Sequence, residues 1–196
     1  MLTLYHAPQS RSSRFVWLLE EIGEPYEVEY ISIGSRPGGP DARNPHPHKK
    51  APALVHDGEL IHESAAIALY LADAFPAAGL GPKVGEAGRG TYLTWLAYYA
   101  GVIEPAMVAK ATAWESPPGM TGWAPFAEVT PRITAQLEAG PWFLGERFTV
   151  MDILVGSLLQ WAGRMFPDTP AYEAYKARIA ERPALARAMA KDVAPA

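Results

Sequence analysis

The sequence predicts an α/β unit of about 75 residues followed by an all-helical unit. Segments in which apolar residues alternate with polar ones occur only in the first part of the chain. After residue 90 the apolar residues recur at helical spacing, and a stretch rich in glycine, proline and alanine lies in between. We therefore expect an N-terminal domain over residues 1–76, a linker over 77–90 and a helical domain over 91–196.

The N-terminal elements are expected in the order β-α-β, loop, β-β-α. Residues 2–6 alternate as a strand does, residues 15–22 have helical spacing, and Gly23 supplies a stop. Residues 26–33 alternate again, and residues 34–47 are so rich in glycine and proline that we expect a loop.

A hairpin and a helix complete this unit. Asp57-Gly58 separates two short apolar runs, at residues 53–55 and 59–61, and an Asp-Gly pair in that position is a strong hairpin signal. A helix is expected to follow over residues 63–75.

The second unit is predicted to contain helices alone. An apolar stripe over residues 92–103 indicates the first helix, which Pro105 should kink near Gly101. Further helices are expected over residues 127–137, after a capping box at Thr149, and over 171–180 and 183–190. Among the aromatic residues we expect the following three in the core: Trp95, Tyr99 and Trp161.

Composition excludes several classes of protein. Apolar residues make up 49% and charged residues 19% of the chain, as in a soluble globular protein, and the formal charge of −4 argues against a nucleic-acid binder. The longest uncharged apolar stretch covers only residues 90–103, whereas a membrane helix needs roughly 20 residues. The first residues do not have the pattern of a signal peptide, so we expect a cytoplasmic protein.

The chain has no cysteine, which excludes disulfides, thiolate metal sites and a cysteine nucleophile. Any sulfur chemistry must therefore use the sulfur of a ligand. No GxGxxG, phosphate loop, HExxH or zinc spacing is present. His46 and His48 could approach a metal, but we expect solvated loop histidines and no metal site.

Four segments carry a resemblance to a known family: LYHAPQSRSSRFVWLLEEIG, HPHKKAPAL, APALVHDGELIHESAAIALYLADAF and GERFTVMDILVG. Together they resemble the cytosolic glutathione S-transferase superfamily, in a bacterial-type, serine-like class. The resemblance spans nearly the whole chain. It implies a thioredoxin-like N-terminal domain, a helical C-terminal domain, a homodimer and glutathione as the co-substrate.

One residue departs from the family pattern. Lys49 replaces the usual glycine, and if that glycine had positive φ, the lysine would be strained by about 1 kcal/mol.

The resemblance also assigns the glutathione site. Pro52 would follow a cis bond and present the backbone of Ala51 to the peptide. Glu63 and Ser64, at a helix start, would bind the two charges of the γ-glutamyl end, and Lys50 would face the glycyl carboxylate. The alternatives are an ordinary strand-start proline, a helix cap with a first-turn acid, and a solvated lysine.

The thiol is expected near the start of the first helix, where a hydroxyl would donate to the thiolate. The candidates are Ser10, Ser12 and Tyr5, in that order, and the alternative is that a serine only caps the helix. Tyr98 and Trp114 are expected to line the electrophile pocket between the domains. Asp152 is expected to cap its helix.

These inferences lead to a glutathione transferase of detoxification type that conjugates the glutathione thiolate to small hydrophobic electrophiles. Two alternatives remain open. One is a non-catalytic binding or interaction module of the same fold, and the other is a glutathione-dependent isomerase or peroxidase.

Overall fold

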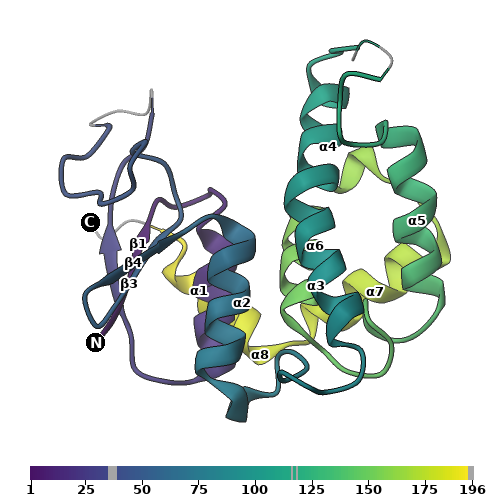
Figure 1. Ribbon diagram of the computed structural model, residues 1–196. Coiled ribbons are helices and arrows are strands. Elements are labelled where there is room, and N and C mark those ends of the chain that lie inside the picture. The colour runs from purple at the N-terminus through teal and green to yellow at the C-terminus, as the bar shows by residue number, and fades with distance from the viewer. Residues whose placement is uncertain (35–38, 116, 118, 194–196) are drawn as a thin grey trace. The chain divides into compact units, whose positions relative to one another are not determined.

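The computed structural model of the chain (Figure 1) describes all residues except 35–38, 116, 118 and 194–196. The predicted loop over 34–47 therefore lies partly outside the described residues. The chain forms two compact units, one made of residues 1–78 and 180–196 and the other of residues 79–179.

The first unit contains the predicted four strands in a mixed sheet of order β2-β1-β3-β4. The strands are β1 (Leu2–His6), β2 (Glu27–Tyr30), β3 (Ala53–His56) and β4 (Glu59–His62). β1 runs parallel to β2 and antiparallel to β3, which pairs with β4 as a hairpin. Asp57 and Gly58 both have positive φ, as the type I′ turn of a two-residue hairpin requires, so the hairpin prediction is confirmed.

Helices α1 (Ser13–Ile22) and α2 (Ser64–Ala74) cover one face of the sheet (Figure 1). Leu2, Leu4 and His6 are the buried members of the alternating pattern of β1. The side chain of Tyr5 points to the opposite face of the sheet. Its partner in the register with β3 is Ala53, which pairs in turn with His62 of β4.

The last helix belongs to this first unit, which differs from the domain boundaries expected from the sequence. Helix α8 (Pro183–Lys191) packs against α1. The guanidinium of Arg182 binds both carboxylate oxygens of Glu21, at 2.5 and 2.6 Å. These pairs connect residues 161 positions apart in the sequence, which hydrophobic periodicity does not reveal.

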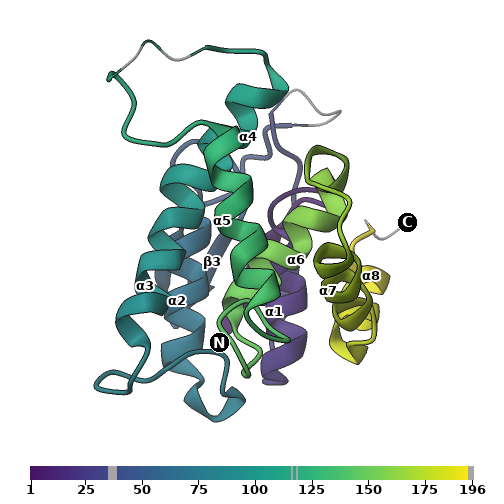
Figure 2. The same cartoon turned by 90° about the vertical axis from the view of Figure 1, so that its right-hand side faces the viewer.

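The second unit is helical, as predicted. Its helices are α3 (Arg89–Tyr98), α4 (Glu104–Ala111), α5 (Phe126–Glu138), α6 (Val150–Ala162) and α7 (Pro170–Ala180). In Figure 2, α4 continues the line of α3, and a π-helical segment (Tyr99–Ile103) joins them. The sequence predicts a kink near Gly101; the structure has a change from α- to π-helical hydrogen bonding there, and Pro105 lies in the first turn of α4.

The capping box of α6 is confirmed. The hydroxyl of Thr149 accepts the N–H of Met151 at 3.2 Å, and the carboxylate of Asp152 accepts the N–H of Thr149 at 2.8 Å. The buried Asp152 also accepts the N–H of Phe143 and the hydroxyl of Tyr175. Burial raises the pKa of Asp152, and these hydrogen bonds oppose that rise.

The core prediction is correct for Trp95 and Tyr99, which are buried, and wrong for Trp161, which is 71% exposed. Trp161 and its neighbour Gln160 lie near the end of α6, on a face that the core does not reach. In the described part of the chain, no helix has both the length and the apolar character needed to span a bilayer.

Candidate functional site

A row of side chains in close contact leads from the start of α1 through His6 to Asp192, next to the end of α8. The hydroxyls of Ser10 and Ser12 lie 2.8 Å apart, and that of Ser12 lies 2.8 Å from Nδ1 of His6. On the other side of the ring, Nε2 of His6 is 3.1 Å from Oδ1 of Asp192. We call these four residues the serine–histidine–aspartate chain.

Ser12 does not serve as a helix cap through its side chain. It occupies the N-cap position of α1, but its φ and ψ of −74° and −18° are helical, and the hydroxyl makes no capping bond. The hydroxyl turns instead to the backbone N–H and C=O of Ala7, at 3.0 and 3.1 Å. It is completely buried, whereas Ser10 is only half-buried.

The environment of His6 keeps the ring neutral near pH 7. Burial lowers the pKa of His6 to about 4, although the carboxylate of Asp192 acts to raise it. The same Oδ1 of Asp192 also accepts the backbone N–H of Gln9 at 2.9 Å and the hydroxyl of Ser13 at 2.8 Å. Two donors, the N–H of Gln9 and the hydroxyl of Ser13, therefore bind this carboxylate oxygen, while Nε2 of His6 lies 3.1 Å from it without the geometry of a hydrogen bond.

Glu63 and Ser64 stand where the sequence predicts, at the start of α2. Glu63 precedes the helix with a φ of 71°, a region that a non-glycine residue adopts at a cost of about 1–3 kcal/mol. Its side chain is 74% exposed and makes no capping bond. The strained backbone thus places the exposed carboxylate of Glu63 beside the N-terminal amide groups of α2, and this is a suitable place to bind charged groups.

The segment before β3 also agrees with the sequence prediction. The Ala51–Pro52 peptide bond is cis, as the family resemblance implies. Lys49 has a φ of 51°, so the condition under which a lysine at this position is strained is met. Its ammonium donates to the carbonyls of Ala42 and Asn44, at 3.2 and 2.5 Å.

Lys50, next along the chain, is exposed, and its carbonyl accepts the side-chain amide of Asn44 at 2.9 Å. The ammonium of Lys49 thus binds carbonyl groups of its own loop, whereas Lys50 is the lysine that is exposed to solvent.

His46, His62 and Glu63 come close enough to share a metal ion, since one candidate ligand atom from each lies within 4.8 Å of the others. The hydrogen bonds of His46 argue against this use. Its Nδ1 accepts the N–H of His48 at 3.1 Å, so the neutral ring carries its proton on Nε2. A metal-binding histidine has a bare nitrogen on the metal and donates from the other nitrogen. His46 fits a structural role in its loop.

The two candidates for the electrophile pocket belong to the second unit. Tyr98 is half-buried at the end of α3, with the guanidinium of Arg132 4.2 Å from the centre of its ring. Trp114 follows α4, is 48% exposed and lies 5.9 Å from the ring of Trp123. In the sequence, Tyr98 directly precedes the π-helical segment, and Trp114 follows it and α4.

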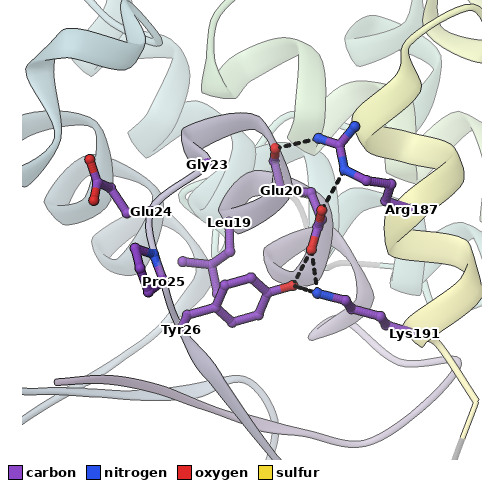
Figure 3. A pocket seen from close by; sticks show the side chains of 8 residues that line it. All are labelled: Leu19, Glu20, Gly23, Glu24, Pro25, Tyr26, Arg187 and Lys191. Atoms are coloured by element: carbon purple, nitrogen blue, oxygen red, sulfur yellow. Dashed lines mark hydrogen bonds and ion pairs between the residues drawn. The ribbon is translucent and has the colours of Figure 1, made fainter.

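A surface pocket of the first unit lies between the end of α1 and α8 (Figure 3). Its centre is an ion cluster in which Glu20 accepts hydrogen bonds from Tyr26, Arg187 and Lys191, at 2.6 to 2.7 Å. Burial alone would raise the pKa of Glu20, but these bonds lower it to about 2. Because its charges already satisfy one another, this pocket is a docking contact for α8 and a poor ligand site.

His6 and Asp192 are the residues that sequence reasoning missed. His6 follows the strand pattern as a buried position, so its alternation carries no functional signal. Asp192 lies 186 positions away and only the docking of α8 brings it near. The remaining clue in the sequence is the cluster of serines at positions 10, 12 and 13, each of which enters the network.

Comparison with known proteins agrees with this arrangement. A family model described as the N-terminal domain of glutathione S-transferase matches residues 4–82. The chain is 26% identical to glutathione S-transferase GstA of Escherichia coli O157:H7, over 97% of this chain and 98% of that protein. It is 28% identical to disulfide-bond oxidoreductase YfcG of E. coli K12, over 97% of this chain and 95% of that protein. The solved structure of a sphingomonad glutathione S-transferase complexed with glutathione is 30% identical, with a TM-score of 0.78 over 97% of this chain and 98% of that one.

Proposed function

Because the chain belongs to the cytosolic glutathione S-transferase superfamily, we propose that it conjugates the thiolate of glutathione to small hydrophobic electrophiles. Glutathione is the co-substrate and supplies the reactive sulfur, since the chain has no cysteine of its own. The proposal includes a homodimer that works in the cytoplasm in detoxification.

The single observation that carries the proposal is the conformation of Glu63. A strained backbone holds its carboxylate in solvent at the start of α2, where it can pair with the ammonium of the γ-glutamyl end. Ser64 and the first amides of α2 suit the neighbouring carboxylate. Both charges of a γ-glutamyl group thus have a partner within two consecutive residues.

Lys50 and the Ala51–Pro52 segment account for the rest of the tripeptide. The exposed ammonium of Lys50 suits the glycyl carboxylate as a flexible point charge. The backbone groups of Ala51 would pair with the extended peptide as an edge strand pairs with its neighbour.

Among the three candidate hydroxyls, burial and hydrogen bonding favour Ser10 as the group that touches the sulfur. Ser12 is completely buried, and its hydroxyl is already shared among Ala7, His6 and Ser10. Tyr5 leaves the sheet on the face opposite to His6 and its serines. Ser10, half-buried at the outer end of the chain of hydroxyls, is the one that a ligand can reach.

The chemistry follows from lowering the pKa of the bound thiol. A free thiol has a pKa of about 8.5, and a helix N-terminus with hydroxyl donors stabilises the thiolate. The thiolate forms a bond to an electrophilic carbon while the leaving group departs with its electron pair. Tyr98 and Trp114 supply the apolar aromatic surface for the electrophile.

A second candidate is the reduction of a disulfide by two glutathione molecules, which the similarity to a disulfide-bond oxidoreductase favours. In that reaction the substrate disulfide becomes two thiols, and the two glutathiones become one disulfide. The same bound thiolate serves both reactions, so the substrate decides between them. A non-catalytic module would bind glutathione without turning over either substrate.

Calorimetry with reduced glutathione and a conjugation assay with an aryl halide test the proposal. Glu63→Ala should weaken glutathione binding at least tenfold, which is about 1.4 kcal/mol, with a smaller effect on turnover at saturation. Glu59→Ala, which removes an exposed acid at the other end of β4, is the matched control and should leave both unchanged.

Absence of binding by the unmodified chain would reject the proposal. Binding without turnover of the aryl halide or a disulfide would favour the non-catalytic module.

A further inference from the structure

We propose that Asp192 is a positioning residue, which fixes the turn before α1 and thereby holds the hydroxyl of Ser10 where the glutathione sulfur is bound. This inference rests on the proposed function, because it requires the sulfur to meet Ser10. It gives the segment at the end of α8 a part in a site whose other residues all come from the N-terminal motifs.

The turn that carries Ser10 has a backbone conformation that must be held in place. Gln9 is exposed and has a φ of 53°, in the left-handed region. A residue other than glycine keeps such a conformation only where the surrounding structure enforces it. Because Gln9 directly precedes Ser10, a change of its backbone angles would redirect the hydroxyl of Ser10.

Asp192 supports this turn on both sides of the peptide bond between Gln9 and Ser10. Its Oδ1 accepts the backbone N–H of Gln9 at 2.9 Å and the hydroxyl of Ser13 at 2.8 Å. The hydroxyl oxygen of Ser13 accepts in turn the backbone N–H of Ser10 at 3.2 Å. One carboxylate oxygen therefore fixes the amide of Gln9 directly and the amide of Ser10 through Ser13.

The direction of the Ser10 side chain depends on this turn. The Ser10 Oγ accepts the N–H of Ser12 at 3.1 Å, and the Ser10 carbonyl accepts the N–H of Ser13 at 3.1 Å. Both bonds join Ser10 to the start of α1 and last only while the turn keeps its shape. A hydroxyl that is displaced by about 1 Å no longer makes a good hydrogen bond to the sulfur.

Asp192 can act as a support because the residue before it is itself held. The hydroxyl of Tyr30 in β2 donates to the carbonyl of Lys191 at 2.9 Å, and the ammonium of Lys191 binds Glu20 of α1 at 2.6 Å. The end of α8 is thus bound to the sheet and to α1. The contact of Asp192 with His6 is not needed for this role.

The charge of Asp192 makes the sign of the effect informative. A carboxylate near the start of α1 opposes the formation of a thiolate there, because like charges repel. Removal of this charge alone should therefore lower the pKa of the bound thiol. Displacement of the Ser10 hydroxyl should raise that pKa, because the thiolate loses a hydrogen-bond donor.

Three variants separate these effects. Asp192→Ala removes both the charge and the acceptor, Asp192→Asn removes the charge and keeps an acceptor oxygen, and Ser13→Ala breaks the link from Asp192 to Ser10 without changing the charge. Glu181→Ala, which removes an exposed acid from the same terminal segment, is the matched control.

Two measurements are made on each protein. The ultraviolet absorbance of the thiolate is titrated for bound glutathione, and calorimetry gives the affinity for S-methylglutathione. This second ligand has the charged groups of glutathione and no thiol, so its binding reports on the folded site without the sulfur contact.

We expect Asp192→Ala and Ser13→Ala to raise the pKa of the bound thiol by about one unit, which is about a tenfold fall in its ionisation constant. The acid limb of the pH profile of kcat/KM should move by the same amount. In Asp192→Asn the pKa should stay at or below that of the unmodified protein. All variants should bind S-methylglutathione as the unmodified protein does, which a general loss of structure would not allow.

An unchanged or lowered thiol pKa in Asp192→Ala, with S-methylglutathione still bound, would overturn the positioning role and leave the proposed function intact. An equal rise in Asp192→Asn would also overturn it, because the acceptor would then have no effect. If Asp192→Ala does not fold, Ser13→Ala decides by the same criterion. An unmodified protein that binds neither ligand would reject the proposed function itself.

Discussion

Neutralising Glu20 should loosen the docking of α8 at neutral pH and have almost no effect in strong acid. Glu20 lies near the end of α1, and its carboxylate binds Arg187 and Lys191 of α8, each at 2.6 Å (Figure 3). Tyr26 donates to the same carboxylate at 2.7 Å. The cluster is the polar part of the contact between two helices that are more than 160 residues apart in sequence.

The magnitude follows from the pKa of Glu20, which is about 2 in the folded protein against an ordinary value of 4.5. A difference of about 2.5 units corresponds to about 3.4 kcal/mol. Arg187 and Lys191 are about half exposed, so screening by solvent reduces the contribution to about 2 kcal/mol. Because the folded pKa is the lower one, this stability is present above about pH 4.5 and is lost as the pH falls toward 2.

Hydrogen exchange of the α8 amides measures this contribution locally. At pH 7, Glu20→Gln should lower the protection factors of α8 by about 30-fold, which corresponds to about 2 kcal/mol. Near pH 2 the unmodified protein and the variant should have the same protection. Glu24→Gln, an exposed acid on the same pocket, is the control and should behave as the unmodified protein at both pH values. An equal difference between Glu20→Gln and the unmodified protein at both pH values would refute the electrostatic explanation.

Two further changes test the packing of each unit by urea unfolding. Asp152→Ala should lower the free energy of unfolding by about 3–5 kcal/mol, because the buried donors of Phe143, Thr149 and Tyr175 lose their acceptor. Thr149→Ala should lower it by only about 1 kcal/mol, and equal losses in the two variants would refute the network. The free energy of unfolding of Lys49→Ala should be about 1 kcal/mol lower than that of Lys49→Gly. Both variants lose the ammonium contacts, but only alanine is strained at a φ of 51°. Equal stability of these two variants would mean that the loop relaxes.

Much of the fold could be predicted because its signals are local. The Asp57-Gly58 turn, the Thr149 capping box and the distortion before Pro105 each depend on residues within a few positions of one another. The half of the candidate site that we propose to bind glutathione is local in the same sense, since its residues lie in two short motifs. Sequence reasoning identifies such features because the chemistry and the spacing appear in one window.

The docking of α8 could not be predicted in this way. Nothing in the sequence indicates that an acidic residue of α1 pairs with a basic residue of α8, because exposed acidic and basic residues are common on any helix. The expected boundary therefore assigned residues 180–196 to the helical unit, whereas the structure groups them with the sheet. That grouping brings Asp192 to His6, so the error in the boundary and the missed half of the site have one cause.

The role of Ser12 shows where sequence patterns reach their limit. A serine before a helix is typical of an N-cap, but capping requires an extended backbone that directs the hydroxyl to the second or third amide. Ser12 is already helical, so its hydroxyl turns away from those amides and reaches Ala7 and His6 instead. The φ and ψ angles of Ser12 thus decide whether its hydroxyl caps the start of the helix or lies between the buried His6 and Ser10. Composition and spacing are the same in both cases, so the distinction rests on the backbone alone.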